Sequence, residues 1–160
     1  MPISAGIGTN GMTELKASRV YIDANVFIYA AEGSSEIADP LQSLFRLFAV
    51  KVGVAVTSEL TLAEVLPKAD ILQRRYYLNL IAWSGVIEAH PISRDIVIET
   101  ASYRRIAGMP KLADAIHIVT AMRSGCSQIL SGDLRMKLPD GLSIIGIDRE
   151  NISRLINELS

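Results

Sequence analysis

The sequence predicts an α/β fold, a three-layer α/β/α sandwich with a central parallel sheet. Short apolar segments of strand length alternate with longer segments of helical periodicity along most of the chain. The strand-like segments are mostly apolar, as is typical of strands that are buried on both faces of a sheet. The 160 residues, 49% hydrophobic and 21% charged, are enough to bury one sizeable core.

The first half of the chain predicts two strands, each followed by helix. Residues 19–22 and 53–56 are short and rich in β-branched or apolar side chains, so both are expected to be strands. Helices are expected where apolar side chains recur at helical spacing, over residues 26–29, 41–48 and 60–66. Pro40 suits the first turn of the second helix, and Pro67 ends or kinks the third.

The second half continues the alternation with three more strands. These are expected over residues 86–89, 128–131 and 142–145. Helical periodicity predicts four helices, over residues 70–83, 93–106, 112–123 and 151–159. Ser93 is expected to cap the second of these, the Gly108-Met109-Pro110 segment to break it, and Gly125 to end the third.

Composition limits the class of protein. Residues 1–18 are rich in glycine and lack periodicity, which predicts a flexible tail before a single domain of residues 19–160. One cysteine, Cys126, excludes an internal disulfide and predicts a buried apolar side chain. No signal peptide or membrane span is expected, so a soluble, cytoplasmic protein is predicted. A net charge of −1 means that nucleic acid would have to bind a local basic patch.

Four acidic residues stand where a site is expected. Ligands of parallel sheets bind at the carboxyl ends of the strands. Asp23 ends the first predicted strand, and Asp133 follows the fourth. Asp114 lies in the first turn of the helix over residues 112–123, and Glu64 has apolar neighbours on both sides. Carboxylates in such surroundings are costly unless they are paired or bind metal.

Convergence of the four acids would favour a hard divalent cation, Mg²⁺ or Mn²⁺, which takes oxygen ligands. Such an ion can activate water for attack on a phosphodiester. Each acid also has a simpler interpretation. Asp23 could cap a helix, Asp114 could favour a helix dipole, Asp133 could be a turn residue and Glu64 could face solvent.

Four segments together resemble the PIN domain family, in particular the toxin nucleases of VapBC-type toxin–antitoxin pairs. They are residues 20–26, 58–65, 112–117 and 130–133. The resemblance implies a metal-dependent endoribonuclease whose catalytic metal centre is the four acids, and which leaves a 5′-phosphate and a 3′-hydroxyl. It also implies a homodimer and a cognate antitoxin. Ser131 departs mildly from the family, which often has Thr there, and it keeps the hydroxyl.

Other residues are expected to support the site. Asn25 could orient a carboxylate or cap a helix, and Ser58 could bond near the site, although the N-cap role is favoured. His117, on the same helix face as Asp114, could orient that acid or approach phosphate, but a hydrogen-bonded structural histidine is favoured. Ser131 could support the acids through its hydroxyl.

Substrate phosphate could be bound by three cations near the acids, Lys111, Arg135 and Lys137, which could equally be solvated surface charges. Two other functions remain open. One is a PIN-like nuclease that acts in RNA processing or on DNA outside toxin–antitoxin systems. The other is a catalytically silent PIN-like scaffold that binds RNA or protein.

Overall fold

A computed structural model of the chain describes residues 18–160; the predicted tail falls almost wholly outside the described residues. The sheet has five strands, β1 (Arg19–Ile22), β2 (Ala55–Ser58), β3 (Glu88–His90), β4 (Cys126–Leu130) and β5 (Ser143–Ile145). The helices are α1 (Ala24–Glu32), α2 (Ser35–Val50), α3 (Leu60–Val65), α4 (Ile71–Tyr77), η1 (Leu78–Trp83), α5 (Arg94–Ile106), α6 (Leu112–Arg123) and α7 (Arg149–Leu159). The assignment of residues 19–160 to a single domain stays a prediction.

The sheet is parallel throughout, as predicted, in the order β3-β2-β1-β4-β5. The central strand β1 pairs with β2 on one side, where Val20 lies opposite Ala55, and with β4 on the other, where Tyr21 lies opposite Ile129. The chain builds outward from β1 to β3 and then crosses over to β4. The carboxyl ends of β1 and β4 therefore form the point at which the strand order reverses, and such points create crevices.

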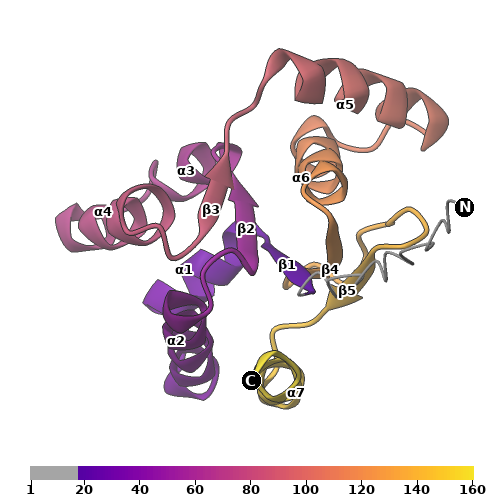
Figure 1. Cartoon of the computed structure of the whole chain (residues 1–160). Coiled ribbons are helices and arrows are strands. Elements are labelled where there is room, and N and C mark those ends of the chain that lie inside the picture. Colours follow the sequence, from indigo (N-terminus) through magenta and orange to yellow (C-terminus); the bar gives the residue numbers. More distant parts are fainter. Residues whose placement is uncertain (1–17) are drawn as a thin grey trace, which may run out of the picture.

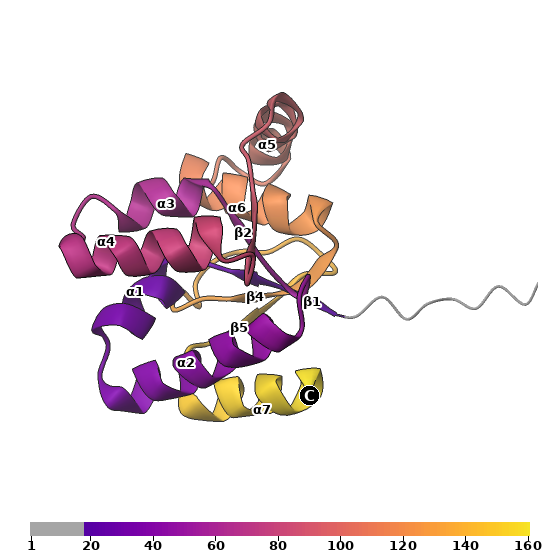
Figure 2. The same ribbon diagram turned by 60° about the vertical axis from the view of Figure 1, so that its left-hand side comes forward.

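Helices cover both faces of the sheet (Figures 1 and 2). On one face α6 lies against the strands and α5 packs outside it; α1, α2 and α7 lie on the other. Side chains of β1 alternate between the two layers: Val20 and Ile22 belong to the core with α1, α2 and α7, and Tyr21 to the core with α6. The predicted three-layer sandwich is confirmed.

Several element bounds differ from the predicted ones. Helix α2 begins before Pro40, which was expected in its first turn. Ile37 extends the apolar face of Leu41 and Leu44 toward the amino end, so burial favours helix in spite of the hydrogen bond that proline cannot make. The single helix expected over residues 70–83 is wrong, because α4 passes into the π-helical turn η1 at Leu78.

Other local predictions are confirmed. The side chain of Ser93 caps α5 by accepting from the Ile96 N–H at 3.3 Å. Gly125, with φ of +72°, follows the end of α6, and α3 ends before Pro67. Cys126 is 7% exposed, and burial raises the pKa of its thiol to about 11. No helix within residues 18–160 is long and apolar enough to cross a membrane.

Candidate functional site

Asp23 is held at the carboxyl end of β1 by hydrogen bonds to both of its oxygens. It is buried, and its Oδ1 accepts from the Ala24 N–H at 2.8 Å, so it caps α1. Its Oδ2 accepts from the Ser131 hydroxyl at 2.6 Å. The Asp23 side chain therefore caps α1 with one oxygen and contacts the segment after β4 with the other. The two contacts fix its position at the end of β1.

Ser131 and Asn25 connect α1 to the segment that follows β4. The fully buried Ser131 hydroxyl accepts from the Asp133 N–H at 3.0 Å and lies 3.4 Å from Asn25 Nδ2. Asn25 Oδ1 accepts from the Gly132 N–H at 3.1 Å. A Cβ at Gly132 would lie 3.2 Å from the Tyr29 ring, so the segment approaches α1 closely. These contacts fix the backbone that carries Asp133.

Asp114 lies in the first turn of α6, facing the same crevice. Partial burial and then the negative charge of Asp23 raise the pKa of its carboxyl above the ordinary value, and Asp133 adds to the rise. His117 and then Lys111 lower this pKa and oppose the rise only in part. The carboxylates of Asp23 and Asp133 thus lie near enough to Asp114 for their charges to raise its pKa, after the larger effect of burial.

Glu64, on α3, joins this group through His117. Its Oε2 lies 2.7 Å from His117 Nε2, and the same nitrogen lies 4.0 Å from Asp23 Oδ1. The other ring nitrogen of His117, Nδ1, lies 2.6 Å from the hydroxyl of Tyr21. His117 is only 2% exposed, so it is a buried, hydrogen-bonded side chain and does not reach the surface where phosphate would bind.

The Ser58 hydroxyl bonds the backbone of α3 and none of the four acids. Ser58 ends β2, and its hydroxyl accepts from the Leu60 N–H at 3.1 Å, so it supports the start of α3. The N-cap position itself is occupied by Glu59, whose side chain makes no capping bond. The predicted hydrogen bond from Ser58 toward the site is not among those of residues 18–160.

The three predicted phosphate-binding cations lie beside the acids. Lys111, Arg135 and Lys137 line one cleft of about 510 Å³ together with Asp114 and Asp133. A second hollow, of about 460 Å³, is also lined by Asp133 and Arg135, together with Asn25 and Tyr29. Asp133 thus borders both hollows, Asp114 borders the larger one, and positive charge lines that larger cleft.

The chemistry of the donor set suits a hard divalent cation, because all four candidate ligands are carboxylates. The charges of Asp23 and Asp133 raise the pKa of the Asp114 carboxyl, and a bound cation would offset them. In the described part of the chain, no three acidic, histidine or cysteine side chains stand close enough to hold one ion. Asp114 and Asp133 line the larger cleft, and one oxygen of Glu64 is bonded to His117.

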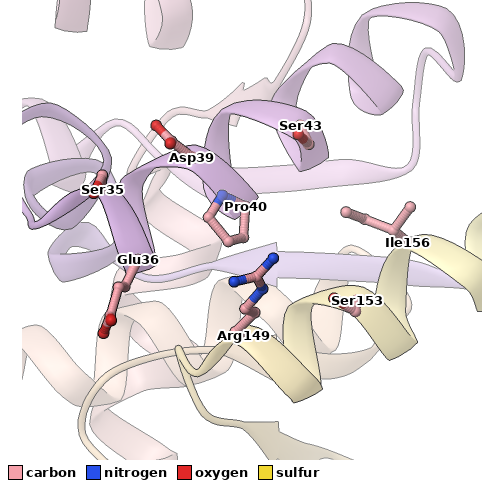
Figure 3. A pocket seen from close by; sticks show the side chains of 8 residues that line it. All are labelled: Ser35, Glu36, Asp39, Pro40, Ser43, Arg149, Ser153 and Ile156. Carbon is pink, nitrogen blue, oxygen red and sulfur yellow. The ribbon is translucent and has the colours of Figure 1, made fainter.

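Another hollow, of about 390 Å³, lies between α2 and α7 (Figure 3). The guanidinium of Arg149 extends toward α2 in this hollow, which is also lined by Glu36 and Asp39. Two carboxylates against one cation leave no excess positive charge for a phosphate. The hollow contains none of the four acids, so it is not part of the candidate site.

Sequence reasoning missed Tyr21, which links the first strand to His117. Its phenol is fully buried, and burial followed by the charge of Asp23 raises its pKa well above the ordinary value. One signal was available. Tyr21 alternates with Val20 and Ile22, so its hydroxyl had to find a partner inside the core.

Comparison with known proteins identifies the family and the fold. No curated protein matches the chain. A solved structure of FitAB bound to an IR36 DNA fragment has a TM-score of 0.55 and 15% identity, covering 79% of this chain and 94% of that one, which shows a shared fold. The PIN domain profile matches residues 20–142, most of the chain. PIN domains are generally nucleases and typically use divalent metal ions. The chain belongs to the PIN domain family.

Proposed function

We propose that this protein is an endoribonuclease that depends on Mg²⁺ or Mn²⁺ and serves as the toxin of a toxin–antitoxin pair. The observation that carries the proposal is the juxtaposition of Asp23, Asp114 and Asp133 with a cleft that Lys111, Arg135 and Lys137 also line. Carboxylates of this kind serve metal-assisted phosphodiester cleavage, and the cations would bind the backbone of the substrate.

The four acids are assigned two roles, metal binding and proton acceptance. Asp23, Glu64, Asp114 and Asp133 would hold the cation directly or through water. When bound, the cation supplies Lewis-acid polarisation of the phosphodiester and activates water for attack. One of the four carboxylates accepts the proton of the attacking water. The bond from phosphorus to the 3′-oxygen breaks, that oxygen takes a proton from solvent, and the water oxygen stays on phosphorus. The products are a 5′-phosphate and a 3′-hydroxyl.

The test is cleavage of a mixed-sequence RNA by the full chain in Mg²⁺ or Mn²⁺. Because a metal contributes several kcal/mol to transition-state stabilisation, EDTA or Asp114→Asn is expected to slow cleavage at least ~100-fold. Asp39→Asn, a matched change at an exposed aspartate of α2, is expected to leave the rate unchanged. Cleavage that survives both EDTA and Asp114→Asn would remove the metal site from the proposal.

The same assay separates the rival functions. A DNA substrate is included because FitAB was solved with a DNA fragment. Cleavage of DNA in place of RNA would favour a DNA nuclease. Binding of RNA without cleavage under any metal condition would favour a silent scaffold. Sequencing the RNA ends that form when the protein is expressed gives the target and the cleavage position.

We infer from the family resemblance that the protein forms a homodimer in the cytoplasm and that a cognate antitoxin blocks the site. Light scattering on the purified chain measures its mass in solution, and a monomer at micromolar concentration would contradict the dimer. A small gene beside the one that encodes this chain is expected to supply the antitoxin. Its co-expression is expected to abolish RNA cleavage.

A further inference from the structure

His117 connects three elements that are far apart in the sequence. It projects from α6, its Nδ1 lies 2.6 Å from the Tyr21 hydroxyl on β1, and its Nε2 lies 2.7 Å from Glu64 Oε2 on α3. Both His117 and Tyr21 are almost completely removed from solvent. The two rings pack edge to face with centroids 5.7 Å apart, which fixes the plane of the imidazole.

Hydrogen-bond chemistry assigns the tautomer of this ring. An ionised Glu64 carboxylate can only accept, so His117 Nε2 must carry the proton that lies between them. A neutral imidazole then accepts at Nδ1, and the Tyr21 phenol has one proton to donate there. With a neutral ring, an arrangement that runs from the phenol through the imidazole to the carboxylate satisfies both short contacts.

Only one oxygen of Glu64 is used by this arrangement. Oε2 accepts from His117, and Oε1 has no hydrogen-bond partner among the described residues. The Glu64 side chain is 33% exposed, whereas His117 behind it is 2% exposed. The buried pair therefore holds the carboxylate through Oε2, and Oε1, which accepts no hydrogen bond from the described residues, is available to a ligand.

We propose that His117, held by Tyr21, is a positioning residue that fixes the Glu64 carboxylate for metal binding. The proposal rests on the proposed function and deepens it, because it explains how an acid on α3 is held toward acids on β1 and α6. Residues that orient a metal ligand in this way typically contribute 10–100-fold to metal affinity.

The experiment measures Mn²⁺ binding to the full chain by calorimetry, without RNA, for a pair of variants. His117→Gln keeps a donor near the position of Nε2, whereas His117→Asn places its amide near Nδ1 and cannot reach Glu64. His117→Asn is expected to weaken Mn²⁺ binding about 10–100-fold, and His117→Gln markedly less. Thr120→Val, which changes another buried polar side chain of α6, is the control for lost stability and is expected to bind Mn²⁺ normally.

A second pair of measurements keeps the inference testable if His117→Asn fails to fold. Tyr21→Phe preserves the shape of the ring and removes the donor to Nδ1. It is expected to weaken Mn²⁺ binding measurably. In the parent, the ¹⁵N spectrum of His117 is expected to show a single Nε2–H tautomer, and in Tyr21→Phe this single tautomer is expected to be lost. Parent-like affinity in both His117→Asn and Tyr21→Phe would overturn the inference, as would equal losses in the Gln and Asn variants.

Two further variants separate this inference from the proposed function. Glu64→Gln and Asp114→Asn both change proposed ligands, so both are expected to weaken Mn²⁺ binding. If neither does, the proposed metal site is wrong and the positioning role is wrong with it. If both do and the His117 and Tyr21 variants do not, the metal site stands and only the positioning role is wrong.

Discussion

Asp114 is a proposed metal ligand, and its ionised carboxylate is also expected to lower the stability of the folded protein, because it is partly buried near the negative charge of Asp23. Burial and the nearby Asp23 raise the pKa of the Asp114 carboxyl in the folded protein. Folding therefore strengthens proton binding at this carboxyl, and the folded state is penalised once the group ionises. The penalty is absent below the unfolded pKa of about 3.9 and grows as the pH rises through the raised folded value.

Asp114→Asn is therefore expected to raise the melting temperature at pH 7 in EDTA. The gain should disappear at about pH 3, where the parent carboxyl is protonated in both states. Thermal unfolding followed by circular dichroism measures it. Adding Mn²⁺ is expected to reverse the order, because a ligand of the folded state stabilises only the protein that binds it. A melting temperature for Asp114→Asn at or below that of the parent at pH 7 in EDTA would contradict the repulsion.

At the residue scale, the sequence locates single acids better than it locates their partners. Asp23 was open to two interpretations, and the structure shows that its two oxygens serve the helix cap and the Ser131 contact together. The bonds from His117 to Tyr21 and Glu64 could not be predicted, because they depend on how β1, α3 and α6 meet in space.

At the scale of elements, two helix starts differ in how they are capped. Asp70 forms a full capping box with Gln73 at the start of α4: each side chain accepts from the other's backbone N–H, at 2.8 and 2.9 Å. Ser34, at the start of α2, makes no side-chain capping bond. The identity of a capping residue therefore does not by itself give its contribution to stability.

Asp70→Ala is expected to lower the free energy of unfolding by about 1 kcal/mol, because it leaves helix N–H groups without a partner. Ser34→Ala, the matched control, should change it by less than about 0.5 kcal/mol. Urea-induced unfolding measures both. Equal losses would mean that Ser34 forms a cap in solution that the structure does not contain.

Element ends were predicted less well than the elements themselves. The strand expected over residues 53–56 is β2, but it begins at Ala55, where pairing with Val20 starts. A strand is delimited by its neighbour's hydrogen bonds, which a single sequence does not contain. The start of α2 likewise depends on tertiary contacts, because Ile37 packs against the core.

At the scale of the whole molecule, the C-terminal helix completes the core. The PIN profile ends at residue 142, yet α7 buries Ile152, Leu155 and Leu159 against the layer that contains α2. The helix thus belongs to the folded unit, although the family match does not include it.

Leu155→Ala is expected to cost about 2–5 kcal/mol of unfolding free energy, since it removes buried methyl groups and leaves a cavity. The neighbouring Arg154→Ala removes only an exposed contact with Glu150, and is expected to cost less than about 0.5 kcal/mol. Urea unfolding, followed in parallel by labelling of the buried Cys126 thiol, measures both. A loss below about 1 kcal/mol for Leu155→Ala would show that α7 is dispensable to the core.

The fold class could be predicted from the sequence, because alternating strands and helices leave few arrangements other than a covered parallel sheet. The strand order could not. Nothing in the residues 126–130 themselves indicates that β4 inserts beside β1 and not beside β3. That order brings Asp133 to Asp23, so the site depends on a feature that only the structure reveals.

Because β1 pairs with β4, the site can form only after the ribosome has synthesised the last third of the chain. Asp23 and Glu64 are made early, but Asp114 and Asp133 lie in the last third of the chain. At roughly 5–20 residues per second, several seconds separate the first acid from the last. A growing chain carries an incomplete site throughout that interval. During this interval of several seconds, the cell can translate a partner protein before the first complete site forms.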